Sequence, residues 1–348
     1  MSKRYFEKKA KEMGFNRPAP YIRKSDYVLP FAIILFFPIL LLCQIILRYI
    51  NTILVCRFEP YIGDLLVETN FISYLKKKKP QQKIIIFTSV SEIFKNNPNV
   101  YKIFKSKNKI KQGILLLFFR SAEKLKLNNI IYFNYPNDVY FYNTQKKEHL
   151  LCGLTKGRRE FSDIASFPKK CEIYLDVFEE KAFRKKFSEL PAKYYLILSE
   201  LNSSQMLVKN WGFENMQKLV NGLPEINWVQ VGTLKERKLN NIKLDLRGKT
   251  NLRELFYIVK NCAAVVCTEG MYTHLSSAFN KNCFTIFSGY HPIEISKYPK
   301  VIPIVKNPQV PCAYCWMQKC PFYTDPKCIK EISVNQVIKK IRKYNLLN

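Results

Sequence analysis

Four short polar segments carry side chains that could do acid–base or phosphate chemistry, and each follows an apolar run. Gly63-Asp64 follows the run 53–57 and opens a helical stretch. A carboxylate in that position can act as a general base that removes a proton from a hydroxyl group. Asp at a helix start is also a frequent N-cap, which accepts from the first backbone N–H groups. The spacing alone leaves both roles open for Asp64.

The second segment combines hydroxyl groups with a lysine. Ser203 and Ser204 follow the apolar run 194–198, and Lys209 comes shortly after them. Hydroxyl and ammonium donors at the start of a helix suit a phosphate group. The alternative is a polar loop with one exposed lysine, because lysine is abundant throughout this chain.

The third and fourth segments add carboxylates and a histidine. Glu269-Gly270 joins the apolar run 263–267 to a helix that contains His274. Free N–H groups at that helix start favour an anion, and Glu269 can accept from sugar or ribose hydroxyls. Glu236 follows the run 228–231, where an acidic residue can bind ribose. Capping and burial are the alternatives for these side chains.

Four cysteines raise the question of a metal site. Cys312, Cys315, Cys320 and Cys328 form the pattern C-x2-C-x4-C-x7-C. Four thiolates can hold zinc, but the usual zinc sites pair two C-x2-C knuckles. The pattern therefore favours a reduced surface loop, and we predict no metal and no cofactor. A chain of this length also needs no disulfide framework, so we expect a reducing compartment.

The elements that must position these segments alternate between strands and helices. Apolar runs predict strands at 53–57, 83–87, 113–119, 129–134, 171–175, 194–198, 228–231, 263–267 and 283–287. Helical spacing predicts helices at 65–75, 252–260, 273–279 and 334–344. This alternation is typical of parallel α/β folds. In such folds ligands bind beyond the carboxyl ends of the strands, where the four polar segments fall.

The 348 residues are enough for two such domains. We predict a basic N-terminus with an apolar helix at 1–50, a first α/β domain at 51–188, a second α/β domain at 189–332 and a closing helix at 333–348. The charged stretch 183–193 is the expected linker. A ligand cleft is expected between the two Rossmann-like domains.

An apolar segment at 28–47 is long enough to cross a bilayer as a helix. Basic residues precede it, so a span would keep the N-terminus cytoplasmic and send the rest of the chain across. Pro38 lies in mid-segment and can break or kink the helix. We therefore expect a monotopic or re-entrant anchor, with a single span as the alternative. A buried core helix is disfavoured, because the segment is apolar on all its faces.

The net charge of +30 favours anionic partners, or reflects solvated lysines. Nucleic acid is a weak candidate, because the chain has no recognised nucleic-acid motif and no basic stripe interleaved with aromatics.

Four sequence blocks, taken in order, resemble one enzyme family. They are IGDLLVETNFISYLKKKKP from residue 62, SSQMLVKNWGFENMQKL from 203, DLRGKTNLRELFYIVKNCAAVVCTEGMYTHLSSAFNKNCFTIFSG from 245 and CPFYTDPKCIKEISVNQV from 320. Together they are similar to the heptosyltransferase-like glycosyltransferases (glycosyltransferase family 9), which have the two-domain GT-B fold. The better-known members carry Asp-Thr-Gly where this chain has Glu269-Gly270-Met271. Because of this difference, the resemblance implies heptose or a similar sugar as the donor sugar, rather than heptose alone.

The resemblance also implies roles. The domain at 51–188 would bind the acceptor, with Asp64 as the base. The domain at 189–332 would bind the nucleotide sugar, and the donor would be held by Ser203, Ser204, Lys209, Glu236, Glu269, Gly270 and His274. The implied reaction is an inverting, metal-independent transfer from a nucleotide sugar such as ADP-heptose to a lipopolysaccharide-core or related surface glycan. We expect it at the cytoplasmic face of the bacterial inner membrane. The alternative is an inactive, membrane-tethered protein of the same fold that binds a glycan or nucleotide.

Overall fold

The computed structural model describes residues 24–133, 148–155, 159–200, 206–307, 310, 312–315, 320 and 322–344. The described chain forms two compact units, and the boundary between them falls after Tyr174. Each unit has its own parallel sheet, as the alternating pattern predicted. Residues 175–188 group with the C-terminal unit, whereas the sequence placed them at the end of the first domain.

The N-terminal unit contains a four-stranded sheet in the order β3-β2-β1-β4, with every described pair parallel. Its strands are β1 (Thr52–Arg57), β2 (Lys83–Thr88), β3 (Lys102–Lys105) and β4 (Ile130–Tyr132). Its helices are α2 (Lys24–Tyr49), α3 (Ile62–Lys78), α4 (Lys109–Lys124) and α6 (Leu150–Leu154), with 3-10 turns η1 (Ser91–Ile93) and η2 (Arg159–Ser166). The predicted strands at 53–57, 83–87 and 129–134 are thus confirmed.

The run 113–119 is helical, so the predicted strand there is wrong. It lies inside α4, which begins after Asn108, whose side chain accepts from the backbone N–H groups of Ile110 and Lys111. A short apolar run fits a buried helix as well as a buried strand, and periodicity cannot separate the two. The reason for the apolar run is packing, because α4 lies against α2 and β4. Its Phe119 is buried in their shared core.

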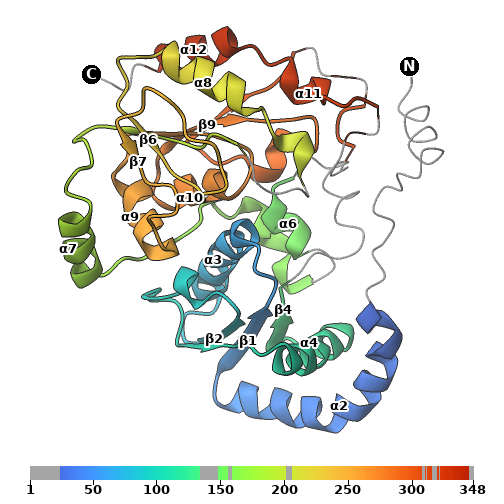
Figure 1. Ribbon diagram of the computed structural model, residues 1–348. Helices are drawn as coiled ribbons and strands as arrows, with labels where there is room; N and C mark the ends of the chain where they lie inside the picture. The colour runs from blue at the N-terminus through green and yellow to red at the C-terminus, as the bar shows by residue number, and fades with distance from the viewer. Residues whose placement is uncertain are drawn as a thin grey trace. The chain divides into compact units, whose positions relative to one another are not determined.

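The long helix α2 belongs to this unit and curves along its edge beneath α4 (Figure 1). It remains one helix through Pro30 and Pro38. Leu40 and Leu47 are buried in the core that also contains Phe119 and Tyr132. One face of α2 is therefore part of the N-terminal unit's own packing.

The C-terminal unit contains a six-stranded parallel sheet in the order β10-β9-β8-β5-β6-β7. The strands are β5 (Tyr195–Ile197), β6 (Trp228–Gln230), β7 (Leu244–Asp245), β8 (Ala264–Thr268), β9 (Asn282–Ile286) and β10 (Val301–Ile304). The helices are α7 (Val177–Lys186), α8 (Phe213–Asn221), α9 (Leu252–Asn261), α10 (Met271–Ala278), α11 (Lys327–Lys330) and α12 (Val334–Lys343), with η3 (Leu207–Lys209) and η4 (Ile293–Ser296). The four strands and three helices predicted in this half are confirmed.

The stretch 171–175 is not a strand, and the expected linker 183–193 begins inside α7. This helix is bound to α9 by ion pairs: Arg253 with Glu179 at 2.6 Å, Lys186 with Glu254 at 2.6 Å, and Lys260 with Glu180. These contacts place α7 in the C-terminal unit. The charged composition of the stretch 183–193 could not reveal them, because it does not show which residues pair.

Both sheets have a topological switch point beside their first strand. In the N-terminal sheet the strand order reverses between β1 and β4, and in the C-terminal sheet between β5 and β8. Loops that leave the carboxyl ends of two such neighbouring strands diverge and leave a crevice for a ligand. The segments that follow β1, β5 and β8 are those that carry Asp64, Lys209 and Glu269.

Candidate functional site

Asp64 lies in the first turn of α3, just beyond the carboxyl end of β1. It is not the N-cap, because that position belongs to Tyr61, which makes no side-chain cap bond. Asp64 instead accepts from Nη2 of Arg57 at 2.7 Å, and its side chain keeps 19% of its surface exposed. The carboxylate is thus held in place by a cation yet open to a substrate hydroxyl.

Arg57 is the last residue of β1, and sequence reasoning missed it. Its side chain is 1% exposed, and its Nη1 donates to the carbonyl of Phe133 at 3.0 Å, just after β4. The guanidinium therefore bridges the two strands that flank the switch point. A basic residue that ends an otherwise apolar strand was the available signal, because a buried charge is costly unless it is paired.

Two more carboxyl groups lie around this arginine. Glu68 is one helical turn beyond Asp64 and fully buried, and neither of its oxygens accepts a hydrogen bond from the described residues. The pKa of Glu68 is raised to about 8. Burial is the largest cause, Arg57 opposes it, and the charges of Glu59 and Asp64 add to it. Glu59 accepts from the Tyr132 hydroxyl at 2.8 Å. We call Arg57, Glu59, Asp64 and Glu68 the β1 cluster.

The C-terminal unit gathers its polar groups around Glu269, directly after β8. Glu269 is 5% exposed and forms an ion pair with Lys209, which ends η3 in the loop that follows β5. These two residues lie on opposite sides of the β5/β8 switch point, so the fold brings together two side chains that the sequence placed in separate segments. The Lys209 ammonium also lies 4.6 Å from the centre of the Tyr290 ring.

The loop after β9 completes this arrangement. His291 Nε2 lies 3.4 Å from Glu269 Oε2, and Ser296 donates its hydroxyl to Glu269 Oε1 at 3.0 Å. Burial on its own would raise the pKa of Glu269, but Lys209, His291 and His274 hold it well below its usual range. Glu269 is therefore a carboxylate, buried and surrounded by donors. We call Lys209, Glu269, His274, Tyr290, His291 and Ser296 the β8 cluster.

His274 and Gly270 belong to α10, whose start faces this cluster. His274 is buried, and its Nδ1 lies 2.7 Å from the Tyr298 hydroxyl. Gly270 is the N-cap, and a methyl group added there would meet no atom of the described residues within 4 Å. Backbone N–H groups at a helix start can bind an anion, so the start of α10 is a candidate anion site.

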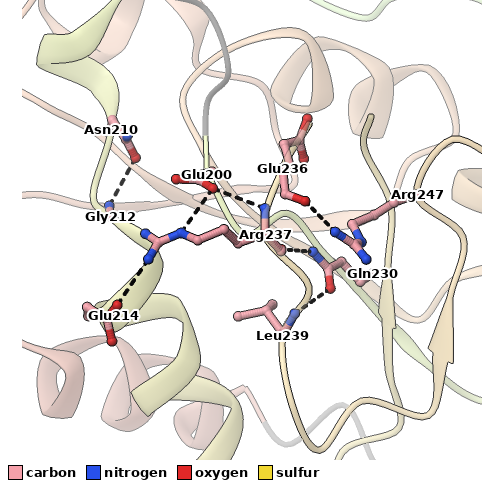
Figure 2. Close-up of polar contacts among 9 residues, drawn as sticks. All are labelled: Glu200, Asn210, Gly212, Glu214, Gln230, Glu236, Arg237, Leu239 and Arg247. Carbon is pink, nitrogen blue, oxygen red and sulfur yellow. Dashed lines mark hydrogen bonds and ion pairs between the residues drawn. The ribbon is translucent and has the colours of Figure 1, made fainter. Parts of the chain in front are cut away.

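Glu236, predicted to meet the nucleoside, is buried in its own turn after β6. Its Oε1 accepts from the backbone N–H of Thr233 at 3.1 Å, and its carbonyl accepts from Arg247 (Figure 2). Burial raises the pKa of Glu236. A methyl group at Gly232 would overlap the carboxyl of Glu236, so this carboxyl packs directly on the glycine.

Arg237, the next residue in the chain, lies in the loop that follows β6 and contacts Glu200, which follows β5. Its backbone N–H donates to Glu200 at 3.1 Å and its Nη1 to Glu214 at 3.2 Å (Figure 2). Its guanidinium also stacks on Phe213, 3.9 Å from the ring centre. Gln230 receives the Leu239 N–H and donates to the Arg237 carbonyl, which fixes this turn.

Ser203 and Ser204 lie outside the described residues, so their predicted contact with the donor stays a prediction. The cysteines Cys312, Cys315, Cys320 and Cys328 are half-buried, and burial raises the pKa of Cys312 to about 11. The part of the chain that the structure describes contains no group of three or more His, Cys, Asp or Glu residues arranged to hold a metal.

The fold agrees with comparisons against known proteins. The family model of glycosyltransferase family 9 (heptosyltransferase) matches residues 145–324, just over half of the chain, so the chain belongs to this family. No curated protein matches the sequence.

Solved structures share the fold at low sequence identity. The E. coli ADP-heptose lipopolysaccharide heptosyltransferase II is 13% identical, covers 85% of this chain and 98% of its own, and has a TM-score of 0.61. The E. coli heptosyltransferase WaaC with ADP-2-deoxy-2-fluoro heptose is 14% identical over 84% of this chain and 99% of its own, with a TM-score of 0.53. The iron-containing dodecameric glycosyltransferase TibC from E. coli H10407 is 12% identical over 86% and 77%, with a TM-score of 0.59.

Proposed function

We propose that this chain is an inverting glycosyltransferase that moves heptose or a similar sugar from an ADP-sugar or similar donor to a hydroxyl of a lipopolysaccharide-core or related surface glycan. The observation that carries the proposal is the Lys209–Glu269 pair at the β5/β8 switch point, bordered by the open start of α10. Structurally similar proteins add support, since WaaC was solved with an ADP-heptose analogue and with ADP.

The β8 cluster suits the donor. Lys209 and the N–H groups of α10 are positive and face one region, so they can neutralise the charge that develops on a leaving diphosphate. Glu269 is a buried carboxylate that can accept from sugar or ribose hydroxyls while it orients Lys209. A ligand phosphate would share Lys209 with Glu269, and His291 lies close enough to Glu269 to compensate for that partial loss.

The β1 cluster suits the acceptor. Asp64 would take the proton from the acceptor hydroxyl as the oxygen attacks the anomeric carbon. The new C–O bond forms on the face opposite the leaving group, and the bond to the diphosphate breaks, so the anomeric centre inverts. Arg57 holds Asp64 in a single orientation during this step. We place the reaction at the cytoplasmic face of the inner membrane, where a nucleotide-sugar donor is available.

Donor binding is tested by thermal unfolding with ADP, UDP, GDP and ADP-heptose. The melting point with each ligand is compared between the wild type and the variant Lys209→Ala. A ligand at 100 times its Kd should stabilise the wild type by about 2.7 kcal/mol. Lys209→Ala should lose this stabilisation, whereas Lys218→Ala, on α8, should keep it. Stabilisation of both variants alike, or of neither protein by any nucleotide, contradicts the donor site.

The proposal also includes transfer without a metal, which needs a separate test because the similar protein TibC contains iron. Activity should persist after treatment with a chelator and exchange into metal-free buffer. Loss of activity that returns with a divalent metal would overturn this part of the proposal and leave the donor and acceptor assignments standing.

A further inference from the structure

The outward face of α2 carries a dense set of apolar side chains that are exposed among the described residues. Between Tyr27 and Tyr49 the only charged residue is Arg48, and the helix is long and apolar enough to cross a membrane. The exposed apolar side chains are Tyr27, Val28, Phe31, Ile34, Leu35, Phe37, Ile39, Leu41, Leu42, Ile45, Ile46 and Tyr49. A continuous apolar surface of this kind marks a binding site for a protein or a membrane.

The inward face of α2 is fixed to the N-terminal unit by polar and aromatic contacts. Gln44 is buried, and its Nε2 donates to Asn129 Oδ1 at 3.1 Å while its Oε1 receives the Asn129 backbone N–H at 3.3 Å. Asn129 in turn donates to the carbonyl of Thr52 at 2.8 Å. Phe36 meets Phe118 of α4 edge to face, with ring centres 5.7 Å apart.

These contacts argue against α2 as a helix surrounded by lipid. A bilayer crossing would either break the Gln44–Asn129 pair and leave a bare amide in hydrocarbon, or carry α4 and the open sheet into the membrane with the helix. A helix that lies in the interface avoids both costs, because only its outward face enters the acyl region. The same reasoning explains why Gln44 occurs within the otherwise apolar stretch 28–47 of this helix.

The charge beside α2 fits an anionic membrane surface. The segment 102–126, which includes α4, carries seven lysines and one arginine against a single acid. Lys107, Lys109 and Lys111 are exposed at the start of α4, and Lys124 and Lys126 are exposed at its end. Ile110 and Ile114, also on α4, are exposed among them. Basic residues beside an apolar insertion are attracted to anionic headgroups.

We propose that α2 lies in the plane of a single membrane leaflet, with its outward face among the acyl chains and the lysines of segment 102–126 at anionic headgroups. This docking surface goes beyond the proposed transferase activity and does not depend on it. It would hold the β1 cluster at the membrane, where a glycolipid acceptor is available.

Vesicle flotation of the full chain tests the surface. The wild type should float with vesicles of phosphatidylcholine and phosphatidylglycerol, and far less with phosphatidylcholine alone. The variant Ile34→Ser/Leu35→Ser/Leu42→Ser/Ile45→Ser should remain folded in solution, because all four side chains are exposed, and should lose flotation. The matched control is Val177→Ser/Phe178→Ser, whose side chains are as exposed on α7, and it should float like the wild type.

Charge is tested in the same assay. Lys107→Glu/Lys109→Glu/Lys111→Glu should lose the preference for phosphatidylglycerol, whereas Lys181→Glu/Lys185→Glu on α7 should keep it. Equal effects of the two charge variants, or flotation that survives the α2 variant, would overturn the proposal. So would a lipid-free dimer that the α2 substitutions dissociate, because a second copy of the chain would then be the occupant.

Depth separates an in-plane helix from a span. Phe31→Trp, Phe37→Trp and Ile45→Trp should all be quenched most by lipids brominated near the headgroup, after subtraction of the wild-type signal. Greatest quenching of Phe37→Trp by lipids brominated at the chain end, with the other two quenched near the headgroup, would show a span and reject the in-plane orientation.

Discussion

The β1 cluster and the β8 cluster occupy equivalent positions in two parallel sheets. Acidic side chains outnumber basic ones in the β1 cluster, and basic side chains outnumber acidic ones in the β8 cluster. The β1 cluster surrounds one arginine with three carboxyl groups, of which Asp64 is accessible and Glu68 is buried. The β8 cluster surrounds one carboxylate with a lysine, two histidines and a helix start. Under the proposed function, the same topology would supply a proton acceptor in one unit and an anion site in the other. The difference lies in the loop residues and not in the sheets.

If the β1 cluster is the base, Asp64→Asn should produce the largest effect. An amide cannot accept the acceptor's proton, so turnover should fall by roughly 10²–10⁴-fold. Nucleotide binding, measured by thermal stabilisation, should be unchanged because it belongs to the other unit. Asp163→Asn, an exposed carboxylate in the same unit, is the control and should transfer sugar normally. Normal turnover in Asp64→Asn would remove the base assignment.

The β8 cluster should be sensitive to the loss of its cation. Lys209→Met leaves Glu269 buried without its main counter-charge, and we expect a loss of about 3–5 kcal/mol in the free energy of unfolding. The double variant Lys209→Met/Glu269→Gln should recover much of this loss, since no buried charge then remains unpaired. It should still fail to bind the nucleotide. Denaturant unfolding of the wild type, Lys209→Met, Glu269→Gln and the double variant measures the coupling, and additive effects of the two substitutions would show that the pair is not coupled.

The buried acid of the β1 cluster should make stability depend on pH in an unusual direction. The pKa of Glu68 is about 8 in the folded protein against 4.5 as its ordinary value, so the folded state keeps a proton that the unfolded chain releases. The free energy of unfolding that this proton contributes is fully present below about pH 4.5 and is lost as pH rises to about 8. In that window the free energy of unfolding falls by up to about 1.4 kcal/mol per pH unit.

Glu68→Gln cannot titrate and should flatten the stability curve in that window. The control Glu189→Gln, at an exposed position, should keep the wild-type slope. Denaturant unfolding at a series of pH values gives both curves. A Glu68→Gln curve parallel to that of the wild type would show that this carboxyl is not protonated in the folded state.

The smallest effects should come from glycines, and they separate the two kinds of loop. Gly270 has an extended backbone, and a methyl group there would meet nothing, so Gly270→Ala should leave stability almost unchanged while it weakens nucleotide binding severalfold. Gly232 has φ of +138° and lies against Glu236, so Gly232→Ala should destabilise the fold. Thermal unfolding with and without nucleotide measures both effects. Unchanged nucleotide affinity in Gly270→Ala would remove the start of α10 from the donor site.

Patterns along the chain were enough to predict two parallel α/β units and most of their strands. They failed where local pattern is ambiguous: the run 113–119 is apolar because it packs on β4 and on α2, and α2 is far away in the sequence. The expected linker 183–193 failed for the same reason, since it begins inside α7, where Lys186 pairs with Glu254 of α9.

The sequence alone was enough to select candidate site residues just after the ends of the strands. Asp64, Lys209, Glu269 and His274 could be selected because parallel strands place their following loops at one edge of a sheet. Only the tertiary structure decided which of them meet. It paired Lys209 with Glu269, added His291 and Ser296 from the loop after β9, and put Arg57 and Glu68 beside Asp64. The physical reason is that a side chain's charge state and its partners depend on burial and on neighbours distant in sequence, which no local pattern encodes.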